Sequence, residues 1–214
     1  QYFPVLRGDV SEDQYFTGEN LRGYFARLGK VEHPVAIAQR SGSSESNVGD
    51  FIADAMRESA GAQVGITNSS GIRSDLPAGP ITKLGLFEIL PFRNMLCTFE
   101  LSGTELRAFA RRHVQSLADH KSSLQLSGLS CSWKRVNGTP EIQHLKVGAE
   151  EVDDAKRYTC ATSDFVVNQA EKYLGMTPGA VTYLPATVFQ ALVAKVGKDK
   201  VVDSRVENRF SETQ

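Results

Sequence analysis

The sequence has few of the features that mark membrane, nucleic-acid-binding or disulfide-rich proteins. No stretch approaches the roughly 18 consecutive apolar residues that a spanning helix requires, so we expect no membrane span. Lys and Arg number 24 against 25 Asp and Glu, a net charge of -1 with no recurring basic stripe, which argues against a nucleic-acid duplex as partner. The cysteines Cys97, Cys131 and Cys160 match no zinc spacing. We expect them to be small buried hydrophobic residues, while a single disulfide stays open.

Motifs for metal-dependent and nucleophilic catalysis are also missing. No pair among His33, His113, His120 and His144 has the H-x-H or H-E-x-x-H spacing that places two ring nitrogens on one ion. His113 and His120 are expected to face solvent on one helix. There is no G-x-S-x-G elbow, no P-loop and no G-x-G-x-x-G run. We therefore expect this chain to hold no cofactor or catalytic metal ion by itself.

The length of 214 residues, 41% of them hydrophobic, is enough for one large globular domain. Residues 1–34 look like a polar lead-in or linker, and residues 35–214 form the expected domain. The chain begins at Gln1, without Met and without the basic start and apolar core of a signal peptide. We therefore expect a processed product or an excised piece.

Apolar periodicity and capping residues predict interleaved helices and strands. Expected helices cover residues 20–29, 47–60, 82–89, 102–117, 164–174 and 186–196. Expected strands cover residues 35–38, 63–67, 94–101, 130–136, 141–147, 157–161 and 201–210. Asn137-Gly138 between two of these strands is a strong hairpin signal. The alternation of helices with hairpins predicts an α+β fold with a mixed β-sheet and flanking helices.

The strand at 63–67 opens onto the loop Thr67-Asn68-Ser69-Ser70-Gly71-Ile72-Arg73, which Leu90-Pro91-Phe92 follows further along the chain. A carboxamide and a guanidinium on a short loop at a strand end suit a polar, planar or anionic ligand. A Phe behind a Pro offers an aromatic face for stacking. The alternative is a tight turn with a surface Arg and a core Phe.

A second aromatic position follows another strand end, in Thr162-Ser163-Asp164-Phe165-Val166-Val167-Asn168. Phe165 could supply a second stacking face, opposing Phe92 across a flat ring. The alternative is that Phe165 is the first buried residue of a helix.

These segments together resemble the C-terminal domain of the 5′-nucleotidase family, which includes UDP-sugar hydrolases and 2′,3′-cyclic phosphodiesterases. The resemblance covers roughly residues 31–210. Its matching segments, in the family's order, are Glu45–Arg57, Thr67–Arg73, Leu90–Phe92, Leu101–Leu106, Leu124–Leu129 and Tyr158–Phe165.

The resemblance implies a nucleotide- or nucleoside-binding domain whose two Phe rings, Phe92 and Phe165, sandwich the base. Asn68 and Arg73 match the family's polar substrate contacts. The partner would be an N-terminal metallophosphoesterase domain or subunit holding two divalent metal ions, and this domain is absent from the chain. An extracytoplasmic location, periplasmic or at the cell surface, follows from the resemblance alone.

The chain departs from the family pattern at three places. Gly42 stands where the family has an Arg, and Arg40 could substitute through a shifted loop. Gln169-Ala170-Glu171-Lys172 replaces Gly-Gly-Asp-Gly, with Glu171 at the place of the sugar-binding Asp. Ser69-Ser70 replaces a Gly-rich pair.

Three functions compete at this point. The first is the substrate-binding domain of a 5′-nucleotidase-type hydrolase, inactive on its own because it lacks the metal site. The second is a degenerate interaction or scaffold domain that no longer binds nucleosides, which the departures motivate. The third, independent catalysis by this chain, has no motif in its favour.

Overall fold

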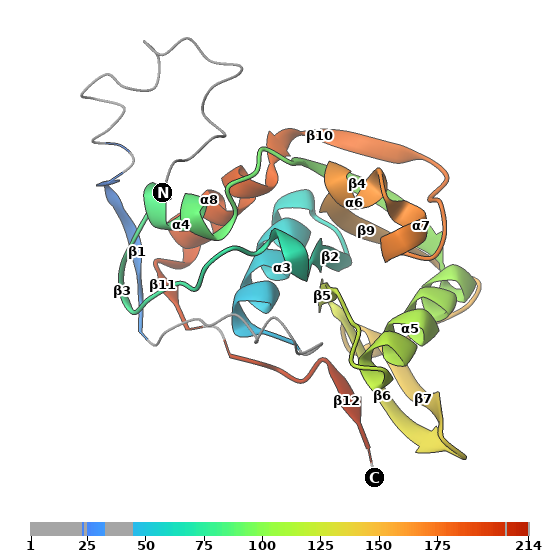
Figure 1. Ribbon diagram of the computed structural model, residues 1–214. Coiled ribbons are helices and arrows are strands. Elements are labelled where there is room, and N and C mark those ends of the chain that lie inside the picture. The colour runs from blue at the N-terminus through green and yellow to red at the C-terminus, as the bar shows by residue number, and fades with distance from the viewer. Residues whose placement is uncertain (1–22, 24, 33–44, 204, 214) are drawn as a thin grey trace.

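Three β-sheets with packed helices make up the part of the chain that the computed structural model describes, residues 23, 25–32, 45–203 and 205–213 (Figure 1). The central five-stranded sheet has the order β10 (Val181–Thr187), β4 (Met95–Ser102), β9 (Arg157–Ser163), β2 (Val64–Asn68), β5 (Leu124–Ser127). The three-stranded sheet has the order β11 (Val201–Val202), β1 (Arg27–Val31), β3 (Gly79–Thr82). The four-stranded sheet has the order β12 (Phe210–Glu212), β6 (Leu129–Val136), β7 (Thr139–Val147), β8 (Glu150–Glu151).

The helices are α3 (Asn47–Ala60), α4 (Lys83–Ile89), α5 (Gly103–Ala118), α6 (Asp164–Val167), α7 (Ala170–Tyr173) and α8 (Val188–Asp199), with the short 3₁₀ helix η2 (Ser69–Gly71). In the central sheet β2 pairs with β9 in parallel, while the other pairs are antiparallel. The α+β fold with a mixed sheet and flanking helices is therefore confirmed.

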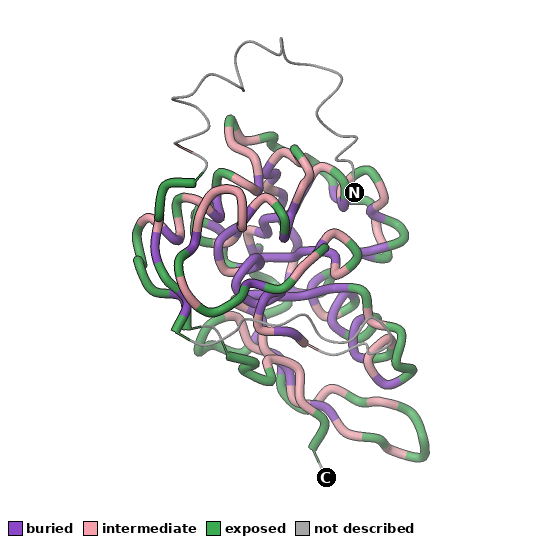
Figure 2. The backbone as a smooth tube through the Cα atoms, turned by 60° about the vertical axis from the view of Figure 1, so that its left-hand side comes forward, coloured by how far each residue is buried: buried purple, intermediate pink, exposed green. Residues whose placement is uncertain are grey.

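Two hydrophobic cores lie on opposite faces of the central sheet. Val64 and Ile66 of β2 pack with Phe109 of α5 in one core, whereas Leu96 of β4 packs with Phe51 of α3 in the other. Alternate strand residues enter different cores because successive side chains of a strand point to opposite faces. Figure 2 shows buried residues concentrated in the body of the molecule, while the β6–β7 hairpin projects with an exposed tip.

Side-chain caps define the two long helices where the sequence predicts them. The Ser46 hydroxyl accepts a hydrogen bond from the Gly49 amide at the start of α3, and Gly61 ends α3 with a φ of 61°. Ser102 and Glu105 form a reciprocal capping box at the start of α5. These local bonds satisfy amides that have no partner within the helix.

Close packing of α3 on the sheet depends on a glycine in β2. A Cβ atom on Gly65 would lie 2.4 Å from the Ala53 carbonyl oxygen of α3. The missing side chain lets helix and strand backbones approach each other. The loop that follows β2 is therefore held against a firmly packed helix–strand pair.

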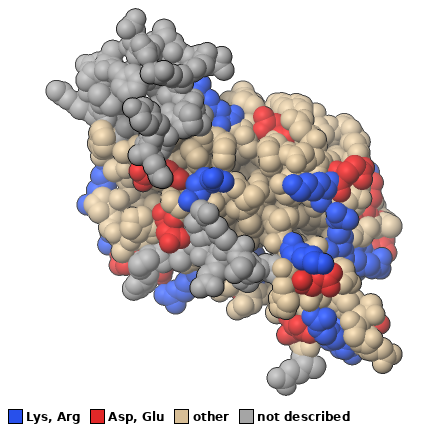
Figure 3. Space-filling model, in the orientation of Figure 1, with Lys and Arg blue, Asp and Glu red and all other residues tan. Residues whose placement is uncertain are grey.

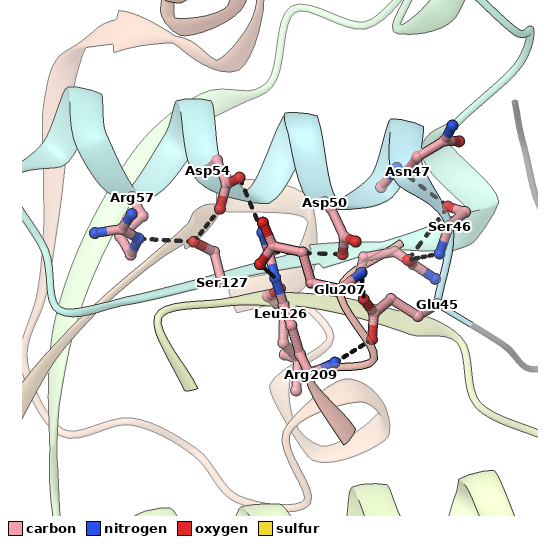
Figure 4. Close-up of polar contacts among 12 residues, drawn as sticks. Glu45, Ser46, Asn47, Asp50, Asp54, Arg57, Leu126, Ser127, Glu207 and Arg209 are labelled. Atoms are coloured by element: carbon pink, nitrogen blue, oxygen red, sulfur yellow. Dashed lines mark hydrogen bonds and ion pairs between the residues drawn. The ribbon is translucent and has the colours of Figure 1, made fainter. Parts of the chain in front are cut away.

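An arginine near the C-terminus ties β12 and its preceding segment to α3 (Figure 4). The Arg209 side chain is 9% exposed, and its guanidinium lies 2.9 Å from Asp54 and 3.5 Å from Asp50. It also donates to the Leu126 carbonyl of β5. The Glu45 carboxylate accepts hydrogen bonds from the Glu207 and Arg209 amides at 2.8 and 2.6 Å. The cluster joins three segments that are distant in the sequence.

The structure corrects several predicted elements. The helix expected over 20–29 is wrong at its C-terminal end, because Arg27–Val31 form β1 and pair with β3 and β11. The helix expected over 164–174 is split into α6 and α7 around Asn168 and Gln169. The predicted strand at 201–210 is instead two short strands, β11 and β12. The last long helix begins at Val188 and runs past Gly197 to Asp199.

Several other expectations have simple outcomes. His113 is buried at 6% exposure, so the prediction that it faces solvent is wrong, because its ring contacts Phe109 of the same helix and Phe210 of β12. Cys97, Cys131 and Cys160 are buried and free, as predicted.

The strand expected at 35–38 and the boundary between residues 34 and 35 lie outside the described residues. Within the described chain, no helix has the length and apolar character needed to cross a membrane.

Candidate functional site

Three chain segments meet at one edge of the central sheet. Because β2 and β9 are parallel, their C-terminal residues Asn68 and Ser163 lie at the same edge. The antiparallel partner β4 begins there, since Leu96 pairs with Ser163. Loops that leave the carboxyl ends of parallel strands are common ligand positions in α/β sheets. The topology therefore gathers the loop after β2, the segment before β4 and the start of α6.

A cavity of about 90 Å³ lies at this edge, and we refer to it as the edge cavity. Three of the predicted site residues, Asn68, Phe92 and Phe165, line it. The remaining lining residues are Thr67, Ser70, Gly71, Leu90, Asn94, Ser163 and Val188. Two aromatic rings, two amide side chains and two serines thus surround one small space.

Hydrogen bonds fix the loop that carries Asn68. The Asn68 Nδ2 donates to the Ser70 hydroxyl at 2.8 Å. The Ser69 amide donates to the Ser123 carbonyl at 2.8 Å, and the Arg73 amide donates to the Ile89 carbonyl at 2.8 Å. Asn68 is 5% exposed, so it lies at the floor of the cavity. A preformed polar floor lowers the ordering cost of binding a ligand.

The two phenylalanines have different surroundings. Phe92 is half-buried and packs against the core around α3 and α8. Phe165 is 38% exposed, and its ring centroid lies 6.0 Å from that of Tyr173 at an interplanar angle of 50°. The alternative of Phe165 as the first buried residue of a helix is wrong, because Val166 takes the buried position of α6. An exposed Phe at a cavity offers a face for a planar ligand.

The other predicted site residues do not line the cavity. Arg73 is exposed, and its guanidinium donates to the Ser70 carbonyl at 3.4 Å, so it lies next to a lining residue. Glu171 is exposed on α7, where its carboxylate accepts a hydrogen bond from the Thr177 hydroxyl at 2.8 Å. Arg40 lies outside the described residues.

Asn94 and Ser163 are among the lining residues that the sequence did not single out as site residues. Asn94 lies two residues beyond Phe92, and its carbonyl accepts the amide of Val188 at 2.9 Å. Ser163 ends β9, and its hydroxyl caps α6 by accepting the Val166 amide. In the sequence, Asn94 comes just before a strand and Ser163 comes at the end of one. These positions predict a site only when the pairing of β4 with β9 is known.

Among the described residues there is no group of three or more His, Cys, Asp and Glu side chains that could hold a metal ion. The cavity itself has no acidic lining residue and no histidine. Its amides, hydroxyls and rings can bind and orient a planar polar ligand.

Curated proteins similar to this chain are larger than it. The chain is 27% identical over 186 residues to the trifunctional nucleotide phosphoesterase protein YfkN of Bacillus subtilis, covering 79% of this chain and 12% of that protein. It is 26% identical over 201 residues to the protein UshA of Escherichia coli, covering 87% of this chain and 36% of that protein. The chain therefore spans about a third or less of the length of these relatives.

Solved structures share the fold at low sequence identity. A 5′-nucleotidase precursor from Thermus thermophilus matches with a TM-score of 0.75 and 24% identity, over 91% of this chain and 41% of that one. The NAD nucleotidase of Haemophilus influenzae matches with a TM-score of 0.77 and 17% identity, over 92% of this chain and 40% of that one. Each match accounts for well under half of the larger protein.

The family comparison agrees with the fold and with the order of the sequence motifs. The model described as "5′-nucleotidase, C-terminal domain" matches residues 27–177, which is more than half of the chain. The chain therefore belongs to the family of 5′-nucleotidase C-terminal domains.

Proposed function

We propose that this chain binds a nucleotide or nucleoside, whose base stacks between Phe92 and Phe165 in the edge cavity. Asn68 forms hydrogen bonds with polar atoms of the base, and Arg73 contacts the ligand at the cavity mouth. The observation that carries the proposal is that Asn68, Phe92 and Phe165 line one cavity although they come from three separate segments.

The size of the cavity supports a partly enclosed ligand. Sites that enclose a whole drug-sized molecule measure about 300–1,000 Å³, whereas this cavity measures about 90 Å³. In the proposed complex the cavity encloses part of the planar base, and the attached sugar and phosphate extend outside it. The exposed Arg73 side chain lies beside Ser70, a lining residue of the cavity.

The phosphate would then be presented to a second domain. We propose an N-terminal metallophosphoesterase domain or subunit as partner, because the relatives are about three or more times longer than the matched region. Two divalent metal ions in that domain would supply the Lewis-acid chemistry of phosphate ester hydrolysis. This chain's part is to bind and orient the substrate, so we propose that it is inactive alone. An extracytoplasmic location belongs to the same proposal.

The scaffold alternative lacks a comparable observation. A domain that had lost its ligand would have no need of an exposed phenylalanine beside a polar cavity. Phe165 is 38% exposed at the cavity, and Asn68 remains at its floor. These features favour retained ligand binding over a purely structural role.

Calorimetric titration of AMP, UMP and UDP-glucose into the wild-type chain and into Phe92→Ala tests the proposal. We expect saturable binding of at least one ligand by the wild type, and a loss of roughly 1–3 kcal/mol of binding free energy in the variant. Phe25→Ala is the matched control, because Phe25 is 62% exposed and does not line the cavity. Equally weak binding by the wild type and Phe92→Ala would remove the stacking claim.

A further inference from the structure

A second pocket, of about 160 Å³, lies between α5, α7 and the segment before β5. Three cationic side chains line it: Arg112 from α5, Lys121 from the segment after α5, and Lys172 from α7. Ser116, Ser123 and His113 also line it, and no acidic residue does. Figure 3 shows Lys and Arg atoms over this side of the molecule, near α5 and α7, with Asp and Glu atoms beside them. We refer to this site as the basic pocket.

The cations of the basic pocket lack a direct ion-pair partner within the described residues. Arg112, Lys121 and Lys172 form no ion pair with any carboxylate in that part of the chain. Asp119 and Glu171, close in sequence to Lys121 and Lys172, accept hydrogen bonds from the neutral side chains of Gln115 and Thr177 and form no ion pair with these cations. Three cations close together repel one another unless an anion joins them.

The structure holds two of these cations in place. The Arg112 Nη2 donates to the Lys172 carbonyl at 3.0 Å, which joins α5 to α7. A Cβ atom on Gly175, whose φ is 75°, would lie 2.6 Å from the Arg112 Cδ, so the glycine leaves room for this side chain. The Lys172 ammonium lies 4.8 Å from the Tyr173 ring centroid. Ordered cations lose less entropy when they bind an anion.

His113 contributes a polar group at the inner wall. Its ring lies against Phe109 at an interplanar angle of 8°, and edge-on to Phe210 at 4.7 Å between centroids. Burial lowers the pKa of His113 to about 4, so the ring is neutral at physiological pH. A neutral imidazole offers one N–H donor and one acceptor. Its Nδ1 lies 3.5 Å from the Ser122 hydroxyl, and the ring adds no buried charge.

We propose that the basic pocket is a binding site for a phosphate-class oxyanion, held by Arg112, Lys121 and Lys172 with the hydroxyls of Ser116 and Ser123. A guanidinium and ammonium groups are the side chains that bind phosphate most strongly. The source of the anion is either the free inorganic ion or a phosphate monoester, and both present the same oxygens to these donors.

The basic pocket is separate from the edge cavity, but two contacts connect the residues around the two sites. The Ser123 carbonyl accepts the Ser69 amide of the loop beside the edge cavity. Tyr173 of the basic pocket contacts Phe165 of the edge cavity. The two sites have no lining residue in common, so each can be tested with its own substitutions.

Titration of ¹⁵N-labelled wild-type chain with sodium phosphate, at an ionic strength matched with sodium chloride, tests the proposal. We expect saturable amide shifts centred on Lys121, Ser123 and Lys172. The double variant Lys121→Gln/Lys172→Gln is expected to bind phosphate at least about tenfold more weakly. Lys156→Gln/Lys198→Gln, two exposed lysines outside the pocket, is the matched control and is expected to bind like the wild type.

Further titrations identify the source of the anion and distinguish the basic pocket from the edge cavity. Tighter binding of glycerol phosphate than of inorganic phosphate would identify a monoester as the ligand, and the reverse order would identify the free ion. Phe92→Ala is expected to bind phosphate unchanged, so a failure of nucleoside binding leaves this test intact. The single variants Lys121→Gln and Lys172→Gln are compared with the wild type in the same phosphate titration, because each removes only one positive charge. Equal binding by the wild type and the lysine double variant, or shifts that chloride reproduces, would overturn the proposal.

Discussion

Leu96, near the start of β4, pairs with Ser163, the last residue of β9. This pairing places the segment before β4 beside the segment after β9, and so Phe92 and Phe165 line the same cavity. The parallel pairing of β2 with β9 adds Asn68 at the same edge. Register between strands, more than any local motif, assembles the candidate site.

The two phenylalanines are expected to respond differently to truncation. Phe165→Ala should weaken nucleoside binding by roughly 1–3 kcal/mol with little change in stability, because Phe165 is exposed. Phe92→Ala should weaken binding and also lower the free energy of unfolding by roughly 2 kcal/mol, less than the cost for a fully buried Phe, because Phe92 packs against the core. Calorimetry and urea unfolding measure the two effects. If Phe165→Ala lost as much stability as Phe92→Ala, the different surroundings assigned to the two rings would be contradicted.

Arg73 is expected to distinguish nucleotides from nucleosides. The guanidinium is exposed beside Ser70, where it can approach a phosphate that extends from the cavity. Arg73→Gln should therefore lower the affinity for AMP by on the order of 1 kcal/mol, while adenosine binding stays unchanged. Parallel titrations of the two ligands measure the difference. Arg205→Gln serves as control, since Arg205 is exposed and outside the cavity. Equal losses for both ligands would remove Arg73 as a phosphate contact.

Asp50 is expected to make stability depend on pH. Burial raises the pKa of Asp50 from 3.8 to about 8, Glu45 and Asp54 add to the rise, and Arg209 opposes it. Between about pH 4 and pH 8 the folded chain then keeps a proton that the unfolded chain has lost, so stability falls as the pH rises. Asp50→Asn removes this dependence. The difference in thermal midpoint between variant and wild type should grow across that range and level off above about pH 8. A constant difference would contradict the raised pKa.

Arg209 is expected to be important for stability, because at 9% exposure it pairs with Asp54 and Glu207 and lies 3.5 Å from Asp50. Arg209→Met leaves Asp54 without its cation and should cost about 3–5 kcal/mol. Adding Asp54→Asn should restore part of the loss. Arg205→Met, on the same segment but exposed, should change stability by less than about 0.5 kcal/mol. Denaturant unfolding compares the variants, and similar midpoints for both arginine variants would contradict the role of the cluster.

The sequence predicted best those elements whose signals are local. Helix α3 is specified by the Ser46 cap and the Gly61 stop, and α5 by the Ser102–Glu105 capping box. The β6–β7 hairpin follows from Asn137-Gly138, where both residues have positive φ angles of 51° and 82°. Each of these signals lies within a few residues of the element that it determines.

Elements that depend on distant partners were predicted poorly. β1 has helix-like spacing, but its backbone forms ladders with β3 and β11. β10 was not predicted, because none of its residues is buried and its stability comes from pairing with β4. His113 was expected to face solvent because nothing local shows that Phe210 covers it. Tertiary contacts decide these cases, and a single sequence does not display them.

In the candidate site, too, residues with local sequence signals were predicted and residues that depend on distant partners were not. The loop after β2 and the Phe residues at 92 and 165 could be selected from their motifs, and the structure brings Asn68 and both rings to one cavity. Glu171 was selected by position within a motif, yet α7 directs it to Thr177. Asn94 and Ser163 were missed, because their contribution depends on strand register.

Intermolecular nuclear Overhauser effects between bound adenosine and the two phenyl rings would test the central proposal most directly. With adenosine bound, protons of the adenine ring should show contacts to the ring protons of both Phe92 and Phe165. Saturable adenosine binding with contacts to neither ring, or to only one of them, would contradict base stacking between these two residues.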